Sequence, residues 1–138
     1  VCTRAQAVTF LWRAMGSPEP TGAVSPFTDA DKDAWYYKAV LWATEKGIAV
    51  GTTASTFSPD ETVTRAQAVT FLHRAAGKPA SGGVNAFADV DSAAYYYSAV
   101  RWAAETGVTG GTSAAAFSPA APCTRAQIVT FLYRQFGK

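Results

Sequence analysis

The chain has 138 residues, of which 49% are hydrophobic and 13% aromatic, so its composition excludes a disordered chain and allows one compact domain with a hydrophobic core. The net charge of +2 and the scattered basic residues give no electrostatic footprint for nucleic acid. The sequence has no run of eighteen apolar residues, so it predicts no membrane span.

The first predicted element is a helix within residues 1–16, opened by the sequence Thr-Arg-Ala-Gln. Thr3 followed three residues later by Gln6 is a capping box, in which each residue's side chain bonds to the backbone N–H of the other. Gly16 stands where a residue with left-handed backbone geometry would end the helix. Apolar residues cover more than one stripe of this helix, which indicates burial on two or more sides.

The same opening recurs at Thr64 and at Thr124, with Gly77 and Gly137 as the corresponding terminators. The chain is therefore built from a unit of about sixty residues. A helix of about twelve residues is only marginally stable in isolation, so we expect the three copies to pack together around an approximate threefold axis.

Both cysteines directly precede a capping threonine. Cys2 and Cys123 correspond to Val63 in the middle copy, which favours a small apolar residue that packs as a hydrophobic staple. A disulfide between Cys2 and Cys123 is the alternative, because equivalent positions around a symmetry axis can lie within reach of one another.

The order along the chain is then as follows. Residues 1–16 are the last helix of a unit that the chain enters part-way, 17–26 are a Pro-rich linker, 27–77 are a complete unit, 78–86 are a second linker, and 87–138 are a second complete unit. The apolar spacing in each complete unit predicts a further helix. In the unit 27–77 this helix runs from about Ala34 to Lys46, with Asp31 or Asp33 as its cap. Residues 48–59 predict a small hairpin or a paired extended loop.

These motifs carry a resemblance. Phe-x-Asp, then Trp-Tyr with Ala-Val three residues on, then Gly-Ile-x-x-Gly, Phe-Ser-Pro and Thr-Arg-Ala-Gln, in that order, resemble the S-layer homology domain. The resemblance covers nearly the whole chain. It implies a mainly α fold of tandem repeats around a pseudo-threefold central helical bundle, with short extended loops or hairpins.

The resemblance also implies a function. Such domains attach exported proteins to the bacterial envelope by binding anionic, often pyruvylated, secondary cell-wall polysaccharide, so it implies an extracellular location at the cell surface or cell wall. In the family, the motif arginine lies in a groove between prongs and helps bind the glycan, which maps to Arg4, Arg65 and Arg125. The family usually has Glu where this chain has Gln6, Gln67 and Gln127.

We expect the sugar to be held by three kinds of group. A helix N-terminus offers unpaired N–H groups to an anion, and an arginine at the first helical position adds a planar donor fork for a carboxylate. Trp35 or Tyr95 is expected to stack on the sugar face. Gly51 or Gly111 is expected to let the backbone approach the ligand closely.

Other classes of site fit the sequence less well. The acids Asp29, Asp31 and Asp33 resemble the start of a calcium loop, but Ala34 stands where that loop needs glycine and Val40 where it needs glutamate, so we predict no metal site. The sequence has no catalytic constellation or phosphate loop, which predicts a module without catalytic residues or cofactors. The alternative function is a protein–protein interaction or self-assembly module of a surface-layer protein.

Overall fold

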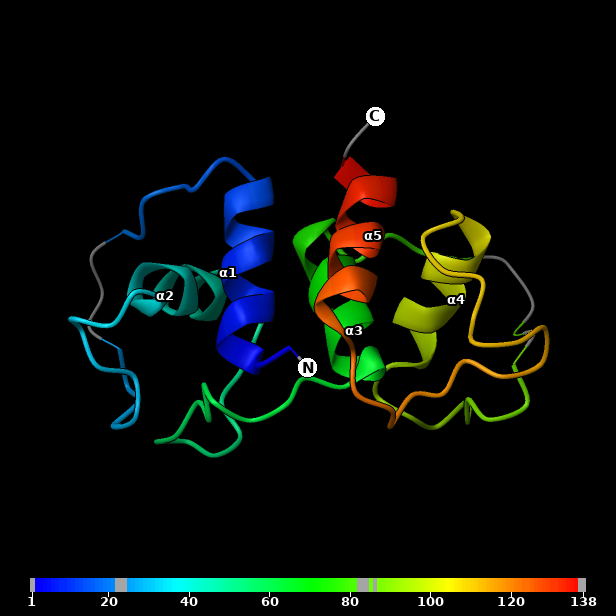
Figure 1. Cartoon of the computed structure of the whole chain (residues 1–138), viewed down its shortest axis with the longest axis horizontal. Coiled ribbons are helices and arrows are strands. Elements are labelled where there is room, and N and C mark those ends of the chain that lie inside the picture. Colours follow the sequence, from blue (N-terminus) through cyan, green and yellow to red (C-terminus); the bar gives the residue numbers. More distant parts are fainter. Residues whose placement is uncertain (1, 22–24, 82–84, 86, 137–138) are drawn as a thin grey trace.

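The computed structural model describes residues 2–21, 25–81, 85 and 87–136. Their helices are α1 (Arg4–Ala14), α2 (Tyr37–Glu45), α3 (Arg65–Ala75), α4 (Tyr97–Glu105) and α5 (Arg125–Phe136). In Figure 1, α1, α3 and α5 stand in the middle of the molecule, while α2 flanks α1 and α4 flanks α3. The mainly α prediction is confirmed. No helix in the described ranges has the length and apolar character to cross a bilayer.

The capping boxes form as predicted. Thr3 Oγ1 accepts from the N–H of Gln6 at 3.1 Å, and Gln6 Oε1 accepts from the N–H of Thr3 at 2.9 Å. The same pair of bonds opens α3 and α5. Gly16 and Gly77 follow α1 and α3 with φ of 92° and 90°, which is the left-handed geometry that glycine adopts without strain. Gly137 lies outside the described residues.

The three central helices pack in a cyclic order. Each pair of them is in contact, and each first-position arginine lies over a phenylalanine of the next helix around the ring. The distances from guanidinium carbon to ring centroid are nearly equal: Arg4 to Phe71 5.7 Å, Arg65 to Phe131 5.6 Å and Arg125 to Phe10 5.7 Å. This regularity confirms the expected pseudo-threefold bundle.

The second helix of the unit is shorter than predicted. It begins at Tyr37, after Tyr36 as N-cap, and no side chain caps it. The prediction that Asp31 or Asp33 is the cap is therefore wrong. Asp31 Oδ1 instead accepts from the N–H of Asp33 at 3.1 Å, so this carboxylate stabilises a tight turn ahead of the helix.

The loop after α2 is fixed by Asp29. Its two carboxylate oxygens accept from the N–H groups of Phe57 and Ser58, both at 2.8 Å. Among the described residues the backbone forms only isolated bridges, Thr3 with Thr62 and Thr64 with Pro122, so the loop is irregular and the hairpin alternative is not realised. The equivalent carboxylate in the later unit, that of Asp89, makes the same two bonds to Phe117 and Ser118.

The cysteines lie in the core and are not bonded to each other. Cys2, Val63 and Cys123 are all fully buried, and both thiols are free. The N–H of Val63 donates to the carbonyl of Cys2, and the N–H of Cys123 donates to the carbonyl of Val63, each at 2.9 Å. The cysteines therefore pack as small apolar residues.

Candidate functional site

Arg4 is a buried residue, with only 4% of its surface exposed. Its Nε donates to the carbonyl of Phe57 at 3.0 Å and its Nη2 to the carbonyl of Val50 at 2.9 Å. The guanidinium carbon also lies 4.8 Å from the centroid of the Phe57 ring. The arginine at the start of α1 is therefore held by the loop that precedes α3.

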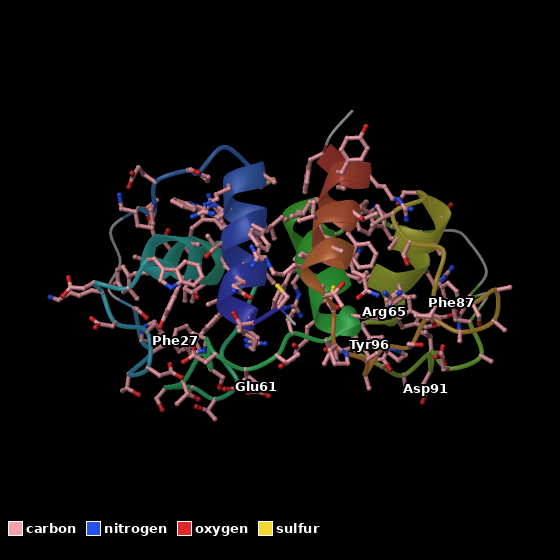
Figure 2. The ribbon with its side chains drawn as sticks, in the orientation of Figure 1. Phe27, Glu61, Arg65, Phe87, Asp91 and Tyr96 are labelled. Atoms are coloured by element: carbon pink, nitrogen blue, oxygen red, sulfur yellow. The ribbon has the colours of Figure 1, made fainter. Side chains whose placement is uncertain are left out.

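Arg65 repeats this arrangement in the next unit. Its Nε donates to the carbonyl of Phe117 at 2.8 Å, and its guanidinium carbon lies 4.8 Å from the Phe117 ring. In Figure 2 it projects from the lower end of α3 towards the part of the chain that carries Phe87 and Tyr96. Burial lowers the pKa of both Arg4 and Arg65, but guanidinium groups stay charged in proteins.

Neither buried arginine forms a salt bridge within the part of the chain that the structure describes. Their charge is met by carbonyl oxygens and aromatic ring faces, which satisfy hydrogen bonds without neutralising the cation. The nearest acids act on the two arginines only from beyond salt-bridge distance, Glu61 and Asp29 on Arg4 and Asp89 on Arg65, so the positive charge at each site is only partly offset.

The helix N-termini differ from the sequence prediction. In α1 the N–H of Arg4 donates to the carbonyl of Glu61 at 2.8 Å, and the N–H of Ala5 donates to that of Pro59 at 3.0 Å. In α3 the corresponding groups of Arg65 and Ala66 bond to loop carbonyls at 2.9 and 3.0 Å. The expected bare amides are therefore absent from α1 and α3, because closing the loop onto each helix consumes them.

A hollow of about 350 Å³ lies against Arg4. We call it the Arg4 hollow, and it is lined by Arg4, Val50, Gly51, Thr52, Gln67, Thr70, Phe71, Arg74 and Tyr95. It thus brings together four of the predicted residues, Arg4 from the first helix, Gly51 and Gln67 from the first complete unit and Tyr95 from the second. Arg74, whose Nη1 donates to the carbonyl of Ile48 at 3.2 Å, was not predicted. Its spacing of seven residues from Gln67 along α3, on one helix face, is the signal that could have identified it.

An equivalent hollow of about 440 Å³ lies against Arg65. The lining of this Arg65 hollow is Arg65, Thr109, Gly110, Gly111, Thr112, Ala126, Gln127, Thr130, Phe131 and Arg134. Three predicted residues meet there: Arg65, Gly111 and Gln127. Arg134 takes the place of Arg74, and its Nη1 donates to the carbonyl of Val108 at 3.2 Å. The two hollows therefore share one design, in which a buried and a less buried arginine face the same space.

The comparison with protein families decides what this repeated design belongs to. The model of the S-layer homology domain matches residues 26–69 and 86–129, which together are more than half of the chain. The chain belongs to the S-layer homology domain family. This membership confirms a non-catalytic anchoring module at the cell surface or cell wall.

Three of the proteins with sequences similar to this chain are, by name, a surface-layer protein, an endoglucanase and a cell surface protein. The chain is 33% identical over 118 residues to the surface-layer 125 kDa protein of Lysinibacillus sphaericus, covering 85% of this chain and 10% of the relative. It is 33% identical over 111 residues to an endoglucanase of Bacillus sp. (strain KSM-635), covering 80% and 12%. It is also 32% identical over 120 residues to a cell surface protein of Thermoanaerobacter kivui, covering 83% and 16%. The chain thus spans only a small part of the length of each relative.

The glutamines of this S-layer homology domain combine capping with a place in the hollows. Gln67 and Gln127 each use Oε1 to accept from the N–H of the capping threonine, at 3.0 and 2.9 Å, and each also lines a hollow. A glutamate would keep that bond but carry a second anionic oxygen, whereas glutamine carries an NH₂ donor there. Gln6 makes the same cap but lines neither hollow.

Gly51 is required by the loop itself. A Cβ at this position would lie 2.4 Å from the carbonyl oxygen of Thr56 and 2.5 Å from the Phe27 ring. Gly111 has a φ of 82° and similar close neighbours. These glycines therefore allow the tight loop that forms the wall of each hollow. The sequence suggested only that they let the backbone approach a ligand closely.

Besides Gln6, two predicted residues line neither of these hollows, Trp35 and Arg125. Trp35 is 61% exposed and lines a different hollow, beside α2, with Trp12 and Lys38. Arg125 is exposed, and within the described ranges no loop covers it as loops cover Arg4 and Arg65. Of the two predicted aromatic residues, Tyr95 is the one that lines an arginine hollow, and it packs edge to face on Tyr96 with centroids 5.1 Å apart.

Proposed function

We propose that this S-layer homology domain anchors its protein to the bacterial envelope by binding an anionic cell-wall polysaccharide in the Arg4 and Arg65 hollows. One observation carries the proposal: each hollow has a buried arginine that forms no salt bridge with the described residues, and a second arginine faces the same space. Neither lining contains an aspartate or a glutamate. An anion that enters therefore meets two positive charges and no like charge.

A pyruvate ketal on a sugar matches the groups in the Arg4 hollow. Its carboxylate suits Arg74, whose guanidinium has donors beyond the one bonded to Ile48, and the amide NH₂ of Gln67 adds a neutral donor. Its methyl group and ring face suit Phe71 and Tyr95. The ligand class that we propose is therefore a pyruvylated or otherwise carboxylated glycan.

Substitution of the arginines near the C-terminal ends of α3 and α5 tests this proposal and leaves the buried Arg4 and Arg65 in place. We expect Arg74→Gln combined with Arg134→Gln to weaken co-sedimentation with purified cell-wall sacculi at least about tenfold, since each site loses a charge-assisted hydrogen bond. Arg13→Gln is the matched control, because Arg13 occupies the same position on α1 and lines neither hollow. Equal binding by the double variant and the control would overturn the proposal.

Removal of the acidic groups from the wall separates glycan from protein contacts. Mild acid hydrolysis of the ketals should abolish binding of the wild-type chain to sacculi. Binding that survives both this treatment and the arginine substitutions would indicate that the domain works as a protein–protein interaction or self-assembly module instead.

A further inference from the structure

A third hollow, of about 470 Å³, adjoins the Arg4 hollow. We call it the His73 hollow, and its lining is Thr70, His73, Arg74, Lys78, Pro79, Ala80, Ser81, Tyr95, Ser98, Ala99 and Arg101. Thr70, Arg74 and Tyr95 line both spaces, so these residues form a shared wall. A ligand longer than one sugar in the Arg4 hollow would therefore extend along Tyr95 into the His73 hollow.

The His73 hollow is cationic. Arg74, Lys78 and Arg101 line it, and its lining contains no aspartate or glutamate. Arg101 donates from Nη2 to the carbonyl of Ser81 at 3.2 Å and lies 5.3 Å from the Tyr97 ring, so it is held in place. Lys78 is exposed and forms no salt bridge with the described residues.

The matching place in the earlier unit lacks this character. There Lys78 corresponds to Ser17 and Arg101 to Leu41. Two lysines line the hollow there, Lys32 and Lys38, and Lys38 is paired at 3.1 Å with Glu19, which lines the same hollow. The hollow of the later unit is thus lined by three Lys or Arg side chains and no acid, whereas that of the earlier unit is lined by two lysines and a glutamate, although both units share the same backbone framework.

His73 preserves the framework while it changes the polarity. Its Nε2 contacts the carbonyl of Pro79 at 2.9 Å, as Nε1 of Trp12 contacts the carbonyl of Pro18 at 2.8 Å. Because a carbonyl only accepts, Nε2 must carry a proton. The His73 ring also packs on Trp102, with centroids 5.3 Å apart. Histidine therefore makes the same contact to the chain after its helix that the indole of Trp12 makes after α1, and its ring is smaller and more polar where it lines the His73 hollow.

From this juxtaposition we propose that the His73 hollow is a second subsite of the Arg4 hollow, which takes the next sugar of the same glycan where that sugar carries an oxyanion. The inference rests on the proposed glycan binding in the Arg4 hollow. The oxyanion is a carboxylate or a phosphate, since Lys78 and Arg101 suit either. The domain would then read at least a disaccharide with two negative charges at this place.

Calorimetry with synthetic sugars tests the inference on the whole 138-residue chain. The probes are a methyl hexoside with a pyruvate ketal, and three disaccharides that extend it by a neutral sugar, a uronic acid or a sugar phosphate. An anionic second sugar should tighten binding about tenfold relative to the neutral one, which is about 1.4 kcal/mol. The uronic acid and phosphate arms identify which oxyanion is preferred.

Residues from the earlier unit supply the variants. Lys78→Ser and Arg101→Leu introduce the residues found at Ser17 and Leu41, and each should reduce the gain from the anionic sugar to below about twofold while the monosaccharide affinity is unchanged. Lys78→Ser combined with Ser17→Lys keeps the net charge and should also lose the gain. Lys78 is exposed, so its variants stay informative even if Arg101→Leu does not fold.

The outcomes separate the two proposals. If the monosaccharide does not bind at all, the proposed function fails and the subsite fails with it. If the monosaccharide binds but the anionic disaccharide gains nothing, the subsite alone is wrong. If the gain from the anionic sugar persists when Lys78→Ser is combined with Ser17→Lys, the subsite is also overturned, because the gain would then reflect only the net charge of the domain.

Discussion

Arg4 contacts Phe57 in two ways, although the two residues are 53 positions apart in the sequence. Its Nε donates to the Phe57 carbonyl at 3.0 Å, and its guanidinium carbon lies 4.8 Å from the Phe57 ring centroid. Arg65 and Phe117 repeat both contacts. The motif arginine therefore joins the start of one central helix to the loop that leads into the next, in addition to any role in ligand binding.

Lysine cannot replace this arginine. It has no Nε–H at that position, and its ammonium group cannot reach the Val50 and Phe57 carbonyls in the same fork geometry. We expect Arg4→Lys to lower the free energy of unfolding by about 2–3 kcal/mol. Urea denaturation followed by circular dichroism measures this change.

The matched control for this substitution is Arg125→Lys. Arg125 is exposed, so its replacement should change the free energy of unfolding by no more than about 0.5 kcal/mol. Equal losses in the two variants would contradict a structural role for the buried arginine.

Thr9 carries a buried hydroxyl that has no hydrogen-bond partner among the residues the structure describes. We expect Thr9→Val to raise the free energy of unfolding by about 1 kcal/mol, because it removes an unsatisfied polar group and keeps the shape of the side chain. Thr70 is the comparison, since its hydroxyl donates to the carbonyl of Ala66 at 2.7 Å. Thr70→Val should be neutral or destabilising, and thermal melts of both variants beside the wild type measure the difference. A loss of stability in Thr9→Val would show that its hydroxyl is satisfied in solution.

The sequence predicted the capped central helices well because a capping box is local: Thr3 and Gln6 need only each other. It missed the fate of the helix N-termini, because the partner of the Arg4 N–H is the carbonyl of Glu61, which no local pattern links to it. Periodicity likewise did not show that Asp29 bonds to the loop 28 residues later. Residue types in the site were predictable, while their pairing across units depended on how the units pack.

Gly51 offers a steric test of the loop that forms the wall of the Arg4 hollow. A methyl group there would lie 2.4 Å from the Thr56 carbonyl oxygen, which is backbone and cannot move aside cheaply. We expect Gly51→Ala to lower the free energy of unfolding by about 2 kcal/mol or more. A Cβ at Gly110 would meet nothing within 4 Å, so Gly110→Ala should be close to neutral. If both variants melt at the wild-type temperature, the loop is not packed as described.

Cys123 gives the domain a dependence on alkaline pH. Burial raises the pKa of its thiol from 9.0 to about 11, with a smaller contribution from Cys2 and an opposing one from Arg65. As the pH rises from 9.0 towards 11, the thiol ionises in the unfolded chain but stays protonated in the folded one. The unfolded state then binds fewer protons, so stability falls, with a slope of at most about 1.4 kcal/mol per pH unit from this group.

Valine at this position should remove that dependence, because Val63 fills the equivalent place in the middle copy. We expect Cys123→Val to match the wild type below pH 9.0 and to be more stable than it between pH 9.0 and 11. Urea denaturation of both proteins at one pH in each range measures the difference. Apart from residue 123 the two chains have the same sequence, so parallel curves throughout would mean that burial does not protect the thiol. A thiol reagent should likewise leave Cys123 unmodified in the native protein and react once urea unfolds it.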